Sequence, residues 1–202
     1  KDYFIKIRHI KISVASATSY ITDWLTYNIT LIIFTFYRVW FAARYHEFAL
    51  DNNRYSHTFY NDNQVLLTNA LLLAISLAAP VIYIVIQFSF PKKQSTLRKF
   101  WNIHCALLAF LAAQTLQVVV VSILKNAVGA PRPDMIRRCM PRSYNLAPIG
   151  YLTNVGICAN INVGVINDGF RSFPSGHAST SFCSSTFTFM VFATRNHISE
   201  RR

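Results

Sequence analysis

One stretch of the sequence has the residue types that bind an anion. Residues 168–177, read as Asp-Gly-Phe-Arg-Ser-Phe-Pro-Ser-Gly-His, lead directly into an apolar segment. Pro174 suits the first turn of a helix and Ser175 can cap one, so unpaired backbone N–H groups and the positive end of the helix dipole would face a ligand. Arg171 and His177 add side-chain donors. The stretch predicts an anion site, and phosphate is the usual anion.

Two further cations lie where they can reach the same anion. Lys125 closes a long apolar stretch, and Arg132 follows seven residues later between Pro131 and Pro133. The two prolines fix the backbone of the arginine and lower the entropy lost in holding it in one place. Lysine supplies a point charge and arginine a planar fork that matches phosphate oxygens. Together with a helix N-terminus, these groups could neutralise a phosphate dianion without a metal.

Four long apolar stretches indicate the elements that position these residues. Hydrophobic residues make up 52% of the 202 residues and charged residues 14%, which is apolar for a soluble protein. We expect an all-α fold, a polytopic bundle of about four transmembrane helices with a polar loop between the third and the fourth. The predicted spans cover about residues 21–43, 65–90, 100–125 and 174–193, and the loop covers residues 126–173.

The distribution of basic residues predicts the orientation. A net charge of +12 first suggests nucleic acid, but the Lys and Arg residues lie between the apolar stretches, which argues against nucleic-acid binding. The N-terminus, the 91–99 loop and the C-terminal tail are basic and should be cytoplasmic, with the 44–64 and 126–173 loops on the far side. Residues 1–20 alternate basic and apolar. We expect a basic amphipathic segment on an anionic membrane face there, in preference to a strand.

Two of the four cysteines, Cys139 and Cys158, fall in the predicted far-side loop, where the compartment is oxidising. A disulfide between them fits that compartment, and two free thiols would look the same in the sequence. Cys105 and Cys183 lie within predicted spans and are interpreted as buried hydrophobic residues.

The pattern resembles the type 2 phosphatidic acid phosphatase superfamily, whose members include lipid phosphate phosphatases and vanadium haloperoxidases. The first motif of that family, a Lys, six residues and Arg-Pro, is matched by Lys125, Arg132 and Pro133. The second motif, Pro-Ser-Gly-His, is matched by residues 174–177. The residues that flank the motifs, including residues 168–172, look most similar to those of fungal diacylglycerol pyrophosphate/phosphatidate phosphatases.

The resemblance implies a role for each matched residue. The groups that would bind the phosphate are Lys125, Arg132, the Ser175 hydroxyl and the Gly176 amide. His177 would protonate the leaving group as general acid, a role that histidine suits near neutral pH. Arg171 is a further candidate for a phosphate contact, and a solvated loop cation is an equally good interpretation of it.

The third motif of the family, Ser-Arg, five residues, His, three residues and Asp, has no match in the sequence. In the family its His attacks phosphorus, and the motif lies at the start of a fifth span of a six-span core. His46 and His57 lie on the predicted far side but have no Arg and Asp at the family's spacing. We therefore expect residues 1–202 to be one membrane-embedded phosphatase domain that is C-terminally incomplete, with the motif beyond Arg202 or in another chain.

The resemblance implies a metal-independent enzyme without a cofactor that hydrolyses phosphatidate, diacylglycerol pyrophosphate or a related lipid phosphate. Its partners would be the lipid substrate and the bilayer. The protein would be an integral membrane protein of the vacuole, endoplasmic reticulum or plasma membrane, with a cytoplasmic N-terminus and a lumenal or extracellular active site. The alternative is a catalytically incompetent membrane protein that binds phospholipid phosphate or a partner.

Overall fold

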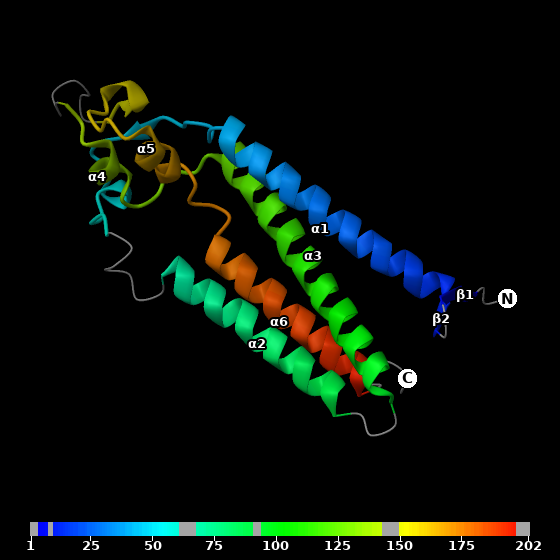
Figure 1. The fold of residues 1–202 in the computed structure, drawn as a ribbon. Coiled ribbons are helices and arrows are strands. Elements are labelled where there is room, and N and C mark those ends of the chain that lie inside the picture. Colours follow the sequence, from blue (N-terminus) through cyan, green and yellow to red (C-terminus); the bar gives the residue numbers. More distant parts are fainter. Residues whose placement is uncertain (1–3, 8–9, 61–67, 91–93, 143–149, 197–202) are drawn as a thin grey trace, which may run out of the picture. The chain divides into compact units, whose positions relative to one another are not determined.

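The computed structural model describes residues 4–7, 10–60, 68–90, 94–142 and 150–196 (Figure 1). These residues are mostly helical, as the sequence predicts. The elements in chain order are β1 Phe4–Ile7, β2 Ile10–Ser13, α1 Val14–Trp40, β3 Phe48–Ala49, the 3₁₀ turn η1 Asn53–Tyr55, α2 Asn69–Ser89, α3 Thr96–Val128, α4 Met135–Cys139, β4 Leu152–Thr153, the 3₁₀ turn η4 Val155–Ile157, α5 Val163–Gly169 and α6 Gly176–Arg195.

Each of the four predicted spans overlaps one of the long helices, α1, α2, α3 or α6. Two stretches, Ala70–Ser89 in α2 and Thr96–Val128, are long and apolar enough to cross a membrane, judged by length and composition. Helix α1 contains Asp23, and α6 alternates Phe with Ser and Thr, which lowers their hydropathy. The four-span bundle therefore stays a prediction.

The preference against a strand over residues 1–20 was wrong for residues 4–7 and 10–13, whereas the location of this segment on a membrane face stays a prediction. Strands β1 and β2 pair antiparallel, with Ile5 opposite Ile12, and α1 begins immediately after them. The alternation of apolar and basic residues has the period of a strand. Ser13 ends the strand and caps the helix, because its hydroxyl accepts a hydrogen bond from the Ser16 amide at 3.2 Å.

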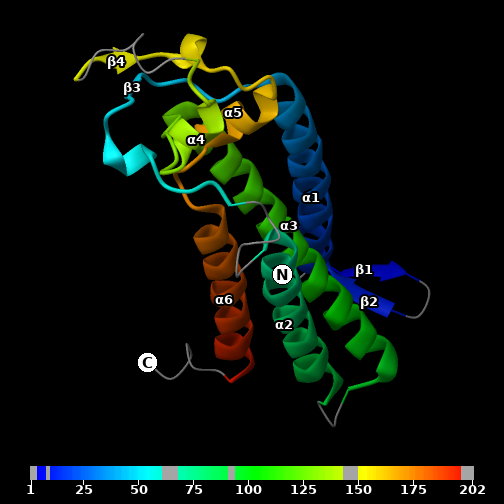
Figure 2. The ribbon, with the colours of Figure 1, turned by 90° about the vertical axis from the view of Figure 1, so that its left-hand side faces the viewer.

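The described residues divide into two compact units, and the first contains most of the helical residues, within 1–34, 73–119 and 180–202. Its parts of α1 and α3 run side by side, as do its parts of α2 and α6 (Figures 1 and 2). Thr30 donates a hydrogen bond to Thr115 at 2.8 Å, and Gln114 donates one to Ser184 at 2.8 Å. Interhelical hydrogen bonds of this kind join helices that pack within a membrane.

Large apolar side chains of the first unit point outward. Ile82, Phe182 and Phe189 are more than half exposed, whereas Ile84 and Phe110 are fully buried. Soluble proteins rarely expose so many contiguous large apolar residues. This distribution suits helices whose outer faces contact lipid.

The second unit comprises residues 35–72 and 120–179. Its core consists of Ala43, Phe48, Met135, Ile136, Cys139, Ile166 and Phe170. Strands β3 and β4 pair antiparallel at its edge, with Phe48 opposite Thr153. The described part of the 126–173 segment, which we expected to be a polar loop, therefore belongs to a small folded body whose core also includes Ala43 and Phe48. Its core residues on α4 and α5 have helical spacing, but these helices of 5 and 7 residues are too short for a helical period to stand out in the sequence.

Candidate active site

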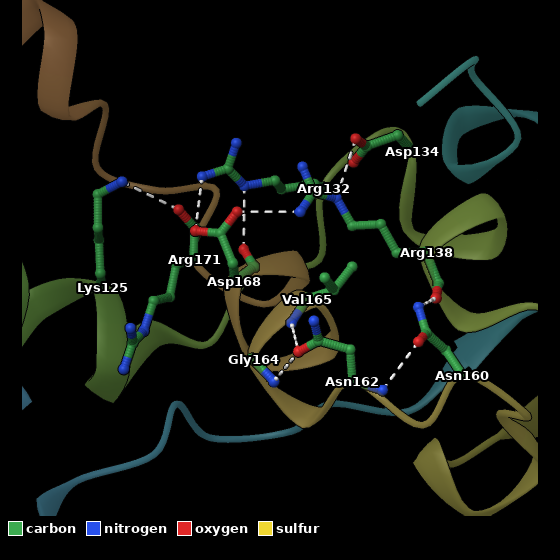
Figure 3. Close-up of polar contacts among 10 residues, drawn as sticks. All are labelled: Lys125, Arg132, Asp134, Arg138, Asn160, Asn162, Gly164, Val165, Asp168 and Arg171. Carbon is green, nitrogen blue, oxygen red and sulfur yellow. Dashed lines mark hydrogen bonds and ion pairs between the residues drawn. The ribbon is translucent and has the colours of Figure 1, made fainter. Parts of the chain in front are cut away.

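The lysine of the first motif lies at the C-terminal end of α3, where the helix is stopped by Gly129. The amide of Gly129 donates to the Lys125 carbonyl at 3.0 Å, and Gly129 has a positive φ of 59°, the usual geometry of a glycine C-cap. The Lys125 ammonium donates to the Arg171 carbonyl at 3.0 Å (Figure 3). A Cβ atom built on Gly176 would lie 3.8 Å from the Lys125 Nζ. The fold thus brings the lysine of the first motif against the glycine of the second.

The second unit holds Arg132 by its backbone and its side chain. Its amide donates to the Gly169 carbonyl at 2.7 Å. In its guanidinium, Nε donates to the Asp168 carbonyl at 3.0 Å, and Nη2 donates to Oδ1 of the same residue at 3.1 Å (Figure 3). About a third of the side chain stays exposed, 33% by area. The guanidinium is therefore oriented by one residue, on a side chain that remains partly exposed.

A second ion pair supports the first. Arg138 on α4 donates from Nη1 to Oδ2 of Asp168 at 3.0 Å, and its Nε lies 2.9 Å from Oδ2 of Asp134. The guanidinium also lies 4.6 Å from the centre of the Phe59 ring. The resulting chain of charges runs from Arg132 through Asp168 and Arg138 to Asp134 (Figure 3). The spacing of Asp134 and Arg138, four residues apart, could have indicated their pair, but no local signal indicates the partners of Asp168.

The short helix that carries Asp168 begins with an asparagine cap. The Asn162 side chain accepts hydrogen bonds from the amides of Gly164 and Val165, at 3.0 and 3.3 Å. Asn160 accepts from the Asn162 amide at 2.9 Å and donates to the Arg138 carbonyl at 2.8 Å (Figure 3). These contacts join the start of α5 to the end of α4, which fixes the two elements that share the ion pairs.

Helix α6 begins with the second motif. Ser175 caps it, because its hydroxyl accepts a hydrogen bond from the Ala178 amide at 3.3 Å and its carbonyl accepts one from Ser179 at 3.1 Å. The cap was predicted correctly, but Pro174 precedes it instead of lying in the first helical turn. The side chains of Ser175 and His177 are exposed. Among the described residues, the imidazole of His177 has no hydrogen-bond partner.

The Arg171 side chain points away from the Lys125 ammonium (Figure 3). Its Nε donates to the side-chain oxygen of Asn126 at 2.8 Å, and its Nη2 donates to the Phe41 carbonyl at 3.2 Å. Asn126 is buried and also donates to Phe41, at 3.2 Å. Arg171 therefore offers its carbonyl, and not its guanidinium, to Lys125. Its predicted contact with phosphate stays a prediction.

The remaining candidate residues have structural partners. A disulfide joins Cys139 to Cys158. The His46 ring bonds to the Val128 carbonyl at 2.8 Å, and the His57 amide donates to the Pro133 carbonyl at 3.0 Å. The predicted phosphate ligands and His177 are thus all found in one compact unit.

Comparison with known proteins identifies the family. Residues 104–200, which contain both motifs, match the PAP2 superfamily. Several proteins named as lipid phosphatases are also similar to the chain. The chain belongs to the PAP2 superfamily. No solved structure matches it.

The similar proteins are longer than this PAP2 chain. The probable diacylglycerol pyrophosphate phosphatase 1 of Schizosaccharomyces pombe is 34% identical over 148 residues, which cover 73% of this chain and 50% of that protein. Lipid phosphate phosphatase 2 of Arabidopsis thaliana is 32% identical over 61% of this chain and 44% of its own length. Lipid phosphate phosphatase 1 of Saccharomyces cerevisiae is 26% identical, with 74% and 61% covered. The chain spans about half the length of the first two relatives.

Proposed function

We propose that the chain carries the phosphate-binding site and the general acid of a metal-independent lipid phosphate phosphatase. The substrates would be phosphatidate, diacylglycerol pyrophosphate or related lipid phosphates. The observation that supports this most directly is the approach of the Lys125 Nζ to Gly176, in the unit that also holds Arg132. The names of the PAP2 relatives, which include diacylglycerol pyrophosphate phosphatase and lipid phosphate phosphatase, agree with it.

In the proposed site the phosphate is bound by charge and by backbone amides together. Ser175 accepts from the amides of Ala178 and Ser179, which leaves the first two amides of α6 directed at the ligand. Lys125 and the accessible part of the Arg132 guanidinium neutralise the phosphate charge. The Ser175 hydroxyl adds a further donor. We assign no nucleophile among residues 1–202.

His177 would donate a proton to the leaving oxygen. Its side chain is exposed at the start of α6, one residue after the glycine that Lys125 approaches. An alkoxide leaving group needs this proton more than a phosphate leaving group does, because an alkoxide is far more basic. Loss of His177 should therefore slow hydrolysis of phosphatidate more than that of diacylglycerol pyrophosphate.

The site would face the lumen or the cell exterior, with the bound lipid's acyl chains among the helices. The disulfide between Cys139 and Cys158 supports an oxidising compartment for the second unit. The apolar helices and the relatives' names support membrane association. The organelle, a vacuole, endoplasmic reticulum or plasma membrane, is not distinguished by these observations.

The test is phosphate release from both lipids in mixed micelles with excess chelator, for the unchanged chain and for His177→Ala. Where a nucleophile is supplied from outside residues 1–202, we expect chelator-resistant release, with the phosphatidate rate lowered about 10²- to 10⁴-fold in His177→Ala and the pyrophosphate rate lowered less. The matched control is His57→Ala, which removes another exposed imidazole from the same unit.

Other outcomes would change the assignment. An equal loss for both lipids would contradict the acid role of His177. Phosphate binding without any release from the folded chain would support the phospholipid-phosphate-binding alternative. The absence of both release and phosphate binding would refute the proposed site.

A further inference from the structure

The carboxylate of Asp168 lies beside the arginine that is proposed to bind phosphate, where a negative charge should oppose binding. Asp168 accepts two hydrogen bonds from Arg132, one at its carbonyl oxygen at 3.0 Å and one at Oδ1 at 3.1 Å. Its side chain is 45% exposed. An acidic group beside a proposed phosphate ligand needs a physical explanation, because its charge would repel the phosphate anion.

We propose that Asp168 is a positioning residue for Arg132, and this inference rests on the proposed function. The guanidinium is planar, so two contacts along its Nε and Nη2 edge fix its plane. The contacts come from one residue that also adjoins Gly169, the acceptor of the Arg132 amide at 2.7 Å. Among the described residues, Nη1 has no hydrogen-bond partner, and it points away from Asp168 (Figure 3). Asp168 thus holds one edge of the fork and leaves the other for phosphate.

Arg138 explains why this carboxylate does not compete with phosphate. Its Nη1 contacts the second oxygen of Asp168 at 3.0 Å, so two guanidinium groups share one carboxylate. Arg138 is itself only 8% exposed and is held by Asp134 at 2.9 Å. A buried guanidinium is neither mobile nor screened by solvent as a surface cation is. Arg138 therefore offsets part of the negative charge of Asp168, whose oxygens orient Arg132.

The opposite interpretation is that Asp168 competes with phosphate for Arg132. The two interpretations predict opposite changes in phosphate affinity when the carboxylate is removed. If competition dominates, removal of the carboxylate tightens phosphate binding, because one repulsive charge is lost. If positioning dominates, removal weakens binding, because the guanidinium must be ordered at the expense of the phosphate.

The experiment measures binding of inorganic phosphate to the purified full chain in detergent with chelator, by phosphorus NMR line broadening. The variants are Asp168→Ala, the isosteric Asp168→Asn, and Arg132→Gln as a reference for loss of the ligand. Glu47→Gln is the matched control, because it removes an exposed carboxylate from the same unit. The isosteric variant keeps an oxygen at the position of Oδ1 if the alanine variant does not fold.

We expect the dissociation constant to rise about tenfold in Asp168→Ala, equivalent to about 1.4 kcal/mol, and less in Asp168→Asn. Glu47→Gln should bind like the unchanged chain. Arg138→Gln should also weaken binding, because it leaves the Asp168 charge without compensation. In that background Asp168→Asn should partly restore binding, the reverse of its effect in the unchanged chain. A role in folding alone would not produce this reversal.

The outcomes separate this inference from the proposed function. If the unchanged chain does not bind phosphate, the proposed function fails, and the inference fails with it. If the unchanged chain binds phosphate and Arg132→Gln abolishes binding, the site exists. Unchanged or tighter binding in the Asp168 variants would then overturn the positioning role alone.

Discussion

Replacement of Gly129 by alanine should destabilise the second unit and displace the end of α3. Gly129 has a φ of 59°, and a Cβ atom there would overlap the carbonyl oxygen of Arg44 and lie 2.9 Å from its carbonyl carbon. The obstacle is backbone, which cannot move aside as the end of a flexible side chain can. The Arg44 amide donates to the Asn126 carbonyl at 2.9 Å, so a shift of this segment breaks a bond to the residue after Lys125.

A substitution at Gly150 separates the two effects of alanine at Gly129, which are the backbone strain of a positive φ and the overlap of the added Cβ atom with Arg44. It also has a positive φ, 85°, but a Cβ atom there would have nothing within 4 Å. Alanine at Gly150 therefore carries only the backbone strain, about 1–2 kcal/mol, offset by about 0.4–1 kcal/mol from the restricted unfolded chain. Alanine at Gly129 adds the overlap, about 1–3 kcal/mol, and the lost hydrogen bond, about 1 kcal/mol. We expect the two variants to differ by about 2–4 kcal/mol, the sum of these added terms.

The assay is thermal unfolding of both variants in the same detergent, followed by phosphate binding at a temperature where both are folded. Gly129→Ala should unfold at a clearly lower temperature than Gly150→Ala and bind phosphate more weakly, because Lys125 lies one turn before the displaced cap. Equal unfolding midpoints would refute the close approach of Gly129 to Arg44. A lower midpoint with unchanged phosphate binding would refute the dependence of the lysine on this helix end.

Three further predictions concern other contacts. Reduction of the disulfide, or Cys139→Ser with Cys158→Ser, should destabilise the second unit by about 3 kcal/mol because the bond closes a loop of 19 residues. Differential scanning fluorimetry with and without reductant would measure the unfolding midpoint. An unchanged midpoint would contradict the prediction. Ser184→Ala should cost about 1 kcal/mol by leaving the buried Gln114 amide unpaired, and adding Gln114→Leu should recover part of the loss in the same assay. Asn126→Ala should lower the unfolding temperature and weaken phosphate binding measured by NMR. The buried Asn126 amide binds the side chain of Arg171, and the Arg171 carbonyl accepts from Lys125. Normal phosphate binding would contradict the second effect.

The positions of the proposed phosphate ligands in the fold were predictable because these residues belong to two short motifs with fixed spacing. The sequence placed Lys125 at a helix end and Ser175 at a helix start, and the structure has both positions. The four long helices were predictable from apolar length alone. Their extension by several residues, as at the start of α1, depends on caps such as Ser13 that the apolar pattern does not include.

The partners of these residues were not predictable, because they depend on the tertiary fold of the second unit. Asp168 lies 36 residues from Arg132 in the sequence, and no periodic pattern links the two. The core of that unit draws single apolar residues, such as Phe48 and Ile136, from segments that are otherwise polar. The N-terminal strands were not predicted for a different reason. The alternation of apolar and basic residues has the two-residue period of a strand, but the basic residues also fit a membrane-surface segment, which was preferred.

The contacts of residues 41–48 determine which fragment of this protein would keep the core of the second unit intact. Ala43 and Phe48 are buried in the core of the second unit, the Ala43 amide donates to the Asn167 side chain at 2.7 Å, and the Phe41 carbonyl accepts from Arg171. Residues 41–48 precede the segment 104–200 that matches the superfamily. A fragment cut to the family boundaries would keep both motifs and lose part of the core that holds them. Transplantation of this site into another scaffold would accordingly require three segments: the two motifs and residues 41–48, which follow α1.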